Sequence, residues 1–375
     1  MFQPAPLPRT IEASFRDLSS SKPATRASAI RDVARHAQRS DTTRNRAIPL
    51  LKKALESDAA SLVRAEAAVA LADIGASDAL PTLLVAVEDD DAYVRQMALS
   101  ALGEIGDPRA TQRLERALRD GRPEVRYQAI IAFARVAKNE PDAVAAALLH
   151  ALEDGDESIC YIAMRLAEEQ LTARGATDSP GASVDSPAFG QRLDLPTTEW
   201  DEKIAARAEQ LIDGAGDSIA VVAGLYLARS GRPRGRAVVL DVIAERRKTP
   251  ELEDEQACIE LAGEVALRDA ISHLERRVWG KRRAIRTILA WGAGDRSSCA
   301  WHARIALARM GHERARYEIL ADLGSWRREK REAAVVAVGR AHIREAQEVL
   351  ERLETAGAPV EVALIREALV RLAAG

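Results

Sequence analysis

The chain of 375 residues has few aromatic residues, three cysteines and no long apolar run. Phe, Trp and Tyr together make up 4% of the residues, whereas the hydrophobic fraction reaches 47%. Aromatic and β-branched residues are the types that favour strands, so this balance favours helices packed through small side chains over a β-sheet core. The cysteines, Cys160, Cys258 and Cys299, show neither metal-ligand nor redox spacing.

Targeting signals are also missing from the sequence. No stretch of about 18 unbroken apolar residues occurs, so we expect no membrane span. The first residues, MFQPAPLPRT, lack a basic region followed by an apolar run, so we expect no secretory signal. Together with the few cysteines, these absences predict a cytoplasmic protein, and the bias toward Ala and Arg suggests a bacterial source.

Sequence motifs of known catalytic chemistry are absent as well. The chain has no Gly-rich phosphate-binding loop, no nucleophile elbow and no His-x-Glu with Cys-x-x-Cys set. Its six histidines are scattered along the chain. We therefore expect a protein that is not an enzyme, with no catalytic residue, no cofactor and no metal site.

What the sequence does contain is a repeat of 31 residues. Val63-Arg64 recurs as Val94-Arg95 and again as Val125-Arg126, and an Asp stands six residues before each Arg. Self-similarity at this period is typical of a solenoid. We predict a structural ladder in which each Arg forms a forked, charge-assisted bond to the Asp of the neighbouring repeat. Its predicted members are Asp58, Arg64, Asp89, Arg95, Asp120 and Arg126.

Apolar residues at helical spacing follow each of these arginines, as at Ala98, Ala101 and Leu102. A glycine such as Gly106 then ends the helix, where a positive φ is easiest for glycine. Asp107-Pro108 starts the next helix, because Pro is favoured in a first turn. The pattern predicts helix pairs over about residues 41–75, 78–106, 108–138 and 140–171.

These segments resemble HEAT repeats, and the short Ala-rich form with GDPRA between units is similar to the bacterial PBS-lyase-type HEAT-like repeat. The resemblance is strong over residues 54–138, fair over 20–53 and 139–171, and weak beyond 199. It implies an all-α fold, an α-solenoid of about ten antiparallel helix pairs with a degenerate second half. It also implies a concave binding face lined by the second helices, and it does not imply lyase activity.

Three segments are predicted along the chain. Residues 1–171 form an N-terminal solenoid, residues 172–198 a flexible linker or long loop rich in Gly, Ser, Pro and Asp, and residues 199–375 a degenerate C-terminal solenoid. Whether the linker is disordered or functional stays open. Cys160 stands where a ladder Arg is expected, so the regular ladder should end there. The segment from Gly311 to Ala315 repeats the form of Gly106 to Ala110, which indicates that the second half is a diverged copy.

A strip on the N-terminal second helices is the predicted partner-binding surface. Its residues are Gln96, Ser100, Tyr127, Ile131, Tyr161 and Arg165. Exposed apolar patches often mark partner sites, and Tyr and Arg are frequent hot spots. We therefore expect a protein or peptide partner here. The alternative interpretation is that these side chains cover the edges of neighbouring helices.

Charge is unevenly distributed, although the net charge is only −3. Residues 270–340 hold 16 Lys or Arg against 7 Asp or Glu, and residues 54–120 hold 6 against 13. Basic residues interleaved with Trp can attract phosphates and stack bases, and this region faintly resembles the HEAT-like DNA alkylation repair proteins, without a match to their catalytic Trp and Asp. The alternative function is nucleic-acid binding, through Arg276, Arg277, Trp279, Lys281, Arg282, Arg283 and Arg286. The opposed charges also permit self-association.

The dipeptide His312-Glu313 resembles the His-Glu pairs of a di-iron HEAT-repeat hydroxylase family. Two metals need several convergent ligands, and the chain has only this one dipeptide, aligned with a turn. The turn is therefore the favoured interpretation. The leading hypothesis for the whole chain is a cytoplasmic, non-enzymatic scaffold or adaptor for protein–protein interaction.

Overall fold

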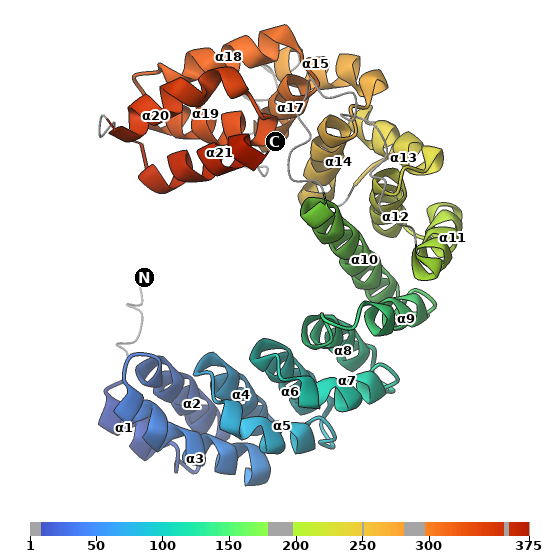
Figure 1. Cartoon of the computed structure of the whole chain (residues 1–375). Helices are drawn as coiled ribbons and strands as arrows, with labels where there is room; N and C mark the ends of the chain where they lie inside the picture. The colour runs from blue at the N-terminus through green and yellow to red at the C-terminus, as the bar shows by residue number, and fades with distance from the viewer. Residues whose placement is uncertain (1–8, 179–197, 250, 281–296, 356–359, 375) are drawn as a thin grey trace, which may run out of the picture. The chain divides into compact units, whose positions relative to one another are not determined.

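The computed structural model describes residues 9–178, 198–249, 251–280, 297–355 and 360–374. Within these ranges the chain folds into 20 α-helices and short 3-10 turns, without strands (Figure 1). The predicted all-α fold is therefore confirmed. The chain divides into two compact units, residues 1–166 and residues 167–375, which we call the N-terminal and the C-terminal unit.

The helices form ten successive pairs, as predicted, and we call the members of each pair its first and second helix. The first five pairs are α1 (Ile11–Asp17) with α2 (Pro23–Ala37), α3 (Asp41–Ser57) with α4 (Ser61–Asp73), α5 (Leu80–Ala86) with α6 (Ala92–Ile105), α7 (Thr111–Ala117) with α8 (Pro123–Val136), and α9 (Pro141–Ala151) with α10 (Glu157–Asp178). The other five are α11 (Glu199–Gly214) with α12 (Asp217–Arg229), α13 (Pro233–Ile243) with α14 (Leu252–Glu264), α15 (Ile271–Trp279) with α17 (Ser297–Arg309), α18 (Glu313–Leu323) with α19 (Arg328–Ala341), and α20 (Gln347–Thr355) with α21 (Val362–Ala374).

The start of the predicted linker is wrong by several residues. Helix α10 continues through Asp178, whereas the sequence suggested a loop from residue 172. Arg174 near the end of α10 forks onto Asp201 of α11, with Nη2 at 2.6 Å from Oδ1, so this helix end is held by a specific partner. The next helix begins after Thr198, which forms a capping box with Asp201. Residues 179–197 of the predicted linker lie outside the described residues.

Small residues let neighbouring second helices approach closely in both units. A Cβ atom added to Gly103 on α6 would lie 3.0 Å from the Cα of Ala132 on α8. In the C-terminal unit, a Cβ at Gly339 on α19 would lie 2.9 Å from the Cα of Ala368 on α21. Both contacts join residues 29 positions apart in sequence. The shared spacing supports the interpretation that the second half is a diverged copy of the first.

The predicted ladder is present in the N-terminal unit. Arg64 donates from Nε and Nη2 to the two carboxylate oxygens of Asp89, both at 2.8 Å, and Arg95 donates to those of Asp120 at 2.9 and 3.0 Å. Nη1 of each arginine donates to the carbonyl of the residue six positions earlier, Asp58 O at 2.9 Å for Arg64 and Asp89 O at 2.8 Å for Arg95. Each arginine thus joins its own turn to the turn of the next repeat.

The ladder also includes Arg26 at its start and Asp154 at its end. Arg126 forks onto Asp154 with both contacts at 2.8 Å. Arg26 forks onto Asp58 at 2.8 and 2.7 Å, and its Nη1 donates to the carbonyl of Ser20, which replaces the Asp of later repeats. Four consecutive repeats are therefore joined to their neighbours by the same bidentate contact.

The ladder stops at Cys160, as predicted. The Cys160 thiol lies 3.2 Å from the carbonyl oxygen of Asp154, so it takes the short-range contact that an arginine makes in the earlier repeats. A thiol is too short to provide the fork to a following repeat. The bidentate series therefore ends within α10.

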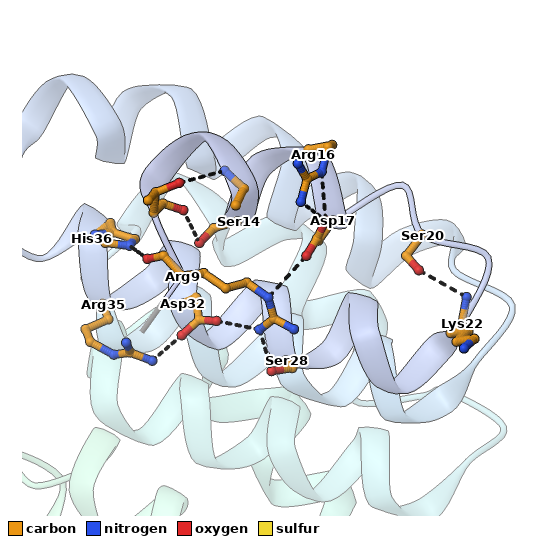
Figure 2. Close-up of polar contacts among 12 residues, drawn as sticks. Arg9, Ser14, Arg16, Asp17, Ser20, Lys22, Ser28, Asp32, Arg35 and His36 are labelled. Atoms are coloured by element: carbon orange, nitrogen blue, oxygen red, sulfur yellow. Dashed lines mark hydrogen bonds and ion pairs between the residues drawn. The ribbon is translucent and has the colours of Figure 1, made fainter. Parts of the chain in front are cut away.

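A different polar cluster holds the first helix pair together (Figure 2). Arg9 donates to Asp17 Oδ2 at 3.1 Å, to Ser28 Oγ at 2.7 Å and to Asp32 Oδ2 at 2.6 Å. The ring Nε2 of His36 lies 2.9 Å from the carbonyl oxygen of Arg9. These contacts fix residue 9 against α1 and α2. Residues 1–8 lie outside the described residues.

Candidate partner-binding surfaces

The ladder carboxylates are stabilised in their ionised form. The fork from Arg26 is the main cause that lowers the pKa of Asp58, and the fork from Arg126 does the same for Asp154. For Asp89, burial is the largest influence and raises the pKa, but Arg64 and the backbone N–H of residue 91 outweigh it, and the net shift is downward. Charged, forked contacts of this kind fix the register of the repeats.

All six predicted partner-binding residues lie on the second helices of three consecutive helix pairs. Gln96 and Ser100 lie on α6, Tyr127 and Ile131 on α8, and Tyr161 with Arg165 on α10. Each is half-buried, so these side chains are partly covered by their neighbours and partly open at the surface. Their role in binding stays a prediction.

Two larger exposed apolar residues on second helices of the N-terminal unit were missed. Leu62 on α4 is 42% exposed and Tyr93 on α6 is 47% exposed, and each stands two residues before a ladder arginine. Met97, one turn after Tyr93, is half-buried. We call this set of residues on α4, α6, α8 and α10 the N-terminal second-helix face: Leu62, Tyr93, Met97, Tyr127, Ile131 and Tyr161. Their equivalent positions relative to the ladder arginines were the signal that could have revealed Leu62 and Tyr93.

Two residues of the predicted nucleic-acid site, Arg277 and Trp279, are held by contacts within the fold. Arg277 is largely buried, donates to the carbonyls of Ile243 at 3.0 Å and Val242 at 3.1 Å, and pairs with Glu255. Its guanidinium therefore joins α15 to the preceding repeat and is not available to bind a phosphate.

Trp279 is likewise held by the fold. Its indole N–H donates to Glu318 at 3.0 Å, and its ring stacks on His312 with centroids 5.4 Å apart. Arg314 lies over the same ring at 4.3 Å. The ring is enclosed by contacts from α18, which argues against its use as a base-stacking platform.

The remaining residues of that predicted site are only partly described. Arg276 is exposed, and it contacts the carbonyl of Ser272 at 3.3 Å and the ring of His273. Lys281, Arg282, Arg283 and Arg286 lie outside the described residues. Binding of nucleic acid by this segment therefore stays a prediction carried by Arg276 and by residues whose placement is not described.

Much of the basic surplus in residues 270–340 is neutralised by acidic residues from elsewhere in the chain. Arg340 pairs with Glu260 at 2.8 Å, and Arg316 pairs with Glu345 at 2.7 Å. Arg304 pairs locally with Asp322 at 3.0 Å. A count over a sequence window overstates the charge of a surface because it omits partners supplied by other repeats.

His312 belongs to a turn, as its sequence context indicated. Gly311 has a φ of +82°, and His312 caps α18 by accepting the backbone N–H of Ala315 at 3.4 Å. The other ring nitrogen lies 2.9 Å from Glu275 Oε1. In the part of the chain that the structure describes, no group of three or more His, Cys, Asp or Glu is placed to hold a metal ion.

The second helices of the C-terminal unit carry a set of ion pairs that sequence reasoning missed. Arg229 on α12 donates to Glu168 on α10 at 2.8 Å and to Glu264 on α14 at 2.7 Å. Arg309 on α17 lies 3.6 Å from the other oxygen of Glu264. Burial is the largest influence on the pKa of Arg229 and opposes its charge, but the two glutamates raise the pKa overall.

A second cluster lies on the same set of helices. Glu260 on α14 accepts from Arg340 on α19 at 2.8 Å and lies 3.3 Å from Nε2 of His302 on α17. Arg340 also lies 5.5 Å from the ring centroid of Trp301. We call Arg229, Glu260, Glu264, Arg309 and Arg340 the C-terminal second-helix face. The pair between Glu260 and Arg340 connects second helices from repeats that are not consecutive, because α17 lies between them in the succession.

None of the described helices has both the length and the hydropathy that a membrane span requires.

Comparison with known proteins agrees with the repeat pattern of the N-terminal unit. The family model for HEAT repeats matches residues 13–92 and again residues 81–167. No curated protein matches the chain.

Several solved structures resemble the chain distantly. Two are engineered proteins, one 18% identical over 59% of this chain and 96% of that chain with a TM-score of 0.39, the other 16% identical over 97% and 99% with a TM-score of 0.41. A third is the complex of CpcE and CpcF of phycocyanin lyase from Nostoc sp. PCC7120, 19% identical over 73% of this chain and 95% of that chain with a TM-score of 0.41. Likenesses at this level say nothing about partners or activity.

The 31-residue repeat, the Asp/Arg ladder and the match to the family model agree over the same part of the chain. Residues 13–167 are therefore HEAT repeats.

Proposed function

We propose that the chain is a non-enzymatic scaffold that binds a protein or peptide along the N-terminal second-helix face. HEAT-repeat solenoids as a class suggest protein interaction. The observation that supports this particular surface is the exposure of Leu62 and Tyr93 beside the half-buried Met97, Tyr127 and Ile131. Exposed apolar and aromatic residues on adjacent helices are typical of partner sites.

The ladder gives this proposal a physical basis. A scaffold that presents side chains from several repeats must hold those repeats in a fixed register, because each loosened repeat would have to be ordered again on binding. The bidentate contacts of Arg64 and Arg95 supply this register on the helix pairs that carry Leu62 and Tyr93. The face is therefore pre-organised before a partner arrives.

The test compares two pairs of substitutions against a purified partner. The partner is captured from cell extract with the wild-type chain, identified, purified and titrated by calorimetry. We expect Tyr127→Ala with Tyr161→Ala to weaken binding by about 2 kcal/mol or more, roughly 30-fold, because buried tyrosines are common hot spots. The control is Tyr317→Ala, a tyrosine 73% exposed on α18, which should leave the affinity unchanged.

The result against the proposal is equally specific. If the double variant keeps its helical content by circular dichroism and binds as tightly as the wild type, the N-terminal second-helix face is not the docking surface.

A further inference from the structure

The second helices α6, α8 and α10 each present one tyrosine at nearly the same position of the repeat. Tyr127 and Tyr161 each come one residue after the ladder position, which holds an arginine on α8 and a cysteine on α10. Tyr93 comes three residues before Gln96, the equivalent position on α6, so it lies about one helical turn away on the same side. Tyr127 and Tyr161 are half-buried, and Tyr93 is 47% exposed. Tyrosines therefore recur along the second helices, one for each helix.

The surface around these tyrosines is uncharged over α6 and α8. Neither residues 96–103 nor residues 127–134 contain a charged side chain. The polar groups there include the half-buried Gln96, Ser100 and Gln128, whose amides and hydroxyl form hydrogen bonds with peptide groups. A segment in the polyproline II (PPII) conformation has no internal hydrogen bonds, so its carbonyls are all available, whereas an α-helix uses its own carbonyls internally. These side chains therefore suit an extended peptide better than a helical one.

The distance between second helices favours one extended conformation. Packed helices lie about 8–10 Å apart, and the small residues Gly103 and Ala132 let α6 and α8 approach closely. A PPII segment completes its turn of three residues in about 9 Å, so it presents an equivalent residue to each successive second helix. A β-strand repeats a side-chain direction every two residues, after about 7 Å, and does not match this spacing. Aromatic surfaces are also a known recognition mode for proline-rich PPII segments.

An acidic residue borders the uncharged surface on α6. Glu104 is exposed and lies in the last turn of α6, which contains no basic residue. The carbonyl end of a helix attracts cations, so this end favours a positively charged group. The equivalent residue on α4 is Asp73, but there Arg44 already donates to the carbonyl of Gly75 at 2.7 Å. On α8 the equivalent residue is Arg135. A basic residue of a partner is therefore matched at the α6 side of the surface and repelled at the α8 side.

We propose that the N-terminal second-helix face binds a proline-rich segment in the PPII conformation, with a lysine or arginine at the end that lies over α6. Its prolines pack on the rings of Tyr93, Tyr127 and Tyr161, its carbonyls accept from amides such as that of Gln96, and its basic residue pairs with Glu104. The inference rests on the proposed scaffold function, because it names the class of partner for the same surface.

The test measures binding of dye-labelled peptides to the full chain by fluorescence anisotropy. The probe has nine prolines and one lysine, and two versions carry the lysine at opposite ends. One control peptide alternates Gly and Ser, and another is Ala-rich and helical, both with the same length and charge. We expect one proline probe to bind saturably and at least about tenfold more tightly than both controls, because proline fixes the bound conformation in advance.

Tyrosine variants test the aromatic part of the surface. Tyr127→Ala should weaken binding of the proline probe about tenfold or more. Tyr127→Phe keeps the ring and should lose less than about threefold. If Tyr127→Ala loses helical content by circular dichroism, Tyr93→Ala replaces it with the same expected loss, because that side chain is the more exposed one. Tyr317→Ala on α18 should leave the affinity unchanged.

A charge variant tests the acidic border. Glu104→Gln should weaken the lysine-bearing probe about threefold, as expected for an exposed ion pair, and should not affect a probe with glutamine in place of lysine. The matched control is Glu115→Gln, which removes an exposed carboxylate on α7 and should change neither titration.

Three results would overturn the proposal. They are the absence of saturable binding by either proline probe, tighter binding of the helical control, and unchanged binding of the proline probe to both Tyr127→Ala and Tyr93→Ala. If the probes fail while the purified natural partner still loses affinity for Tyr127→Ala with Tyr161→Ala, the class of segment is wrong and the docking surface stands. Failure of this inference is therefore distinguishable from failure of the proposed function.

Discussion

The forked ladder of the N-terminal unit and the ion pairs of the C-terminal second-helix face lie on different parts of the repeat. In the N-terminal unit, Arg64 and its counterparts connect the turns between first and second helices, and every fork reaches the next repeat only. In the C-terminal unit, Arg229 and Arg340 form their pairs between the second helices themselves. The same chemistry therefore fixes the register of the turns in one unit and joins second helices to one another in the other.

This difference has a consequence for what each second-helix face can recognise. Because the N-terminal ladder lies in the turns, the middle of that face is left to uncharged side chains such as Met97 and Ile131. The C-terminal face carries charged groups that are already partly matched within the chain. We therefore expect a partner of the first face to be anchored by apolar contacts.

Acidification should give the largest difference between the units. The pKa of each ladder carboxyl is lowered by folding at Asp58, Asp89, Asp120 and Asp154. Their stabilisation is therefore complete above the ordinary Asp pKa of about 3.9 and is lost as the pH falls through the folded values. Hydrogen exchange at a series of pH values should show α4 and α6 losing protection first, with α13 and α14 as the reference. Equal loss in both regions would contradict a ladder-specific effect.

Removing one ladder carboxylate should have the next largest effect. Asp89→Ala leaves the guanidinium of Arg64 without its fork and the N–H of residue 91 without its acceptor, so we expect a loss of about 2–3 kcal/mol in local stability. Asp322→Ala in the C-terminal unit removes a single contact from Arg304 and should cost about 1 kcal/mol. Hydrogen exchange in α4 and α6, and in α17 and α18, measures the two losses. The comparison fails if the two substitutions are equally costly.

The smallest effect is expected where the ladder ends. Cys160→Ala removes weak thiol contacts, of which the one to the carbonyl of Asp154 is the shortest at 3.2 Å, and we expect it to cost less than about 1 kcal/mol. Arg126→Met, at the equivalent position one repeat earlier, removes the fork to Asp154 and should cost about 2 kcal/mol or more. Hydrogen exchange in α8 and α10 measures the local loss of stability in each of the two variants. A cost for Cys160→Ala as large as that for Arg126→Met would mean that the ladder continues through α10.

The sequence was informative wherever an interaction depends on a fixed offset. Asp89 and Arg95 belong to the same short turn and helix start, so their six-residue spacing was enough to predict the ladder, and Gly106 was enough to predict the end of α6. The contact between Gly103 and Ala132 also has a constant spacing, repeated at Gly339 and Ala368, and it could have been found in this way.

Contacts between distant repeats could not be predicted in the same way. Glu260 and Arg340 are 80 residues apart, and they meet only because of the way the second helices stack. Trp279 stands among arginines in sequence, and its partner Glu318 comes from a different helix pair. In both cases the deciding information is the geometry of packing between elements, which the local pattern of residue types does not contain.

The ladder also bears on how an array like this one changes length during evolution. Each arginine contacts its own turn and the next one by the same atoms, and Arg64 and Arg95 are interchangeable in this respect. Recombination that removed one 31-residue period would set Arg64 opposite Asp120 in place of Asp89. The contact at that junction would still join an arginine guanidinium to an Asp carboxylate. Gain or loss of whole repeats therefore leaves every remaining junction chemically intact, so the number of repeats can drift while their stacking is conserved.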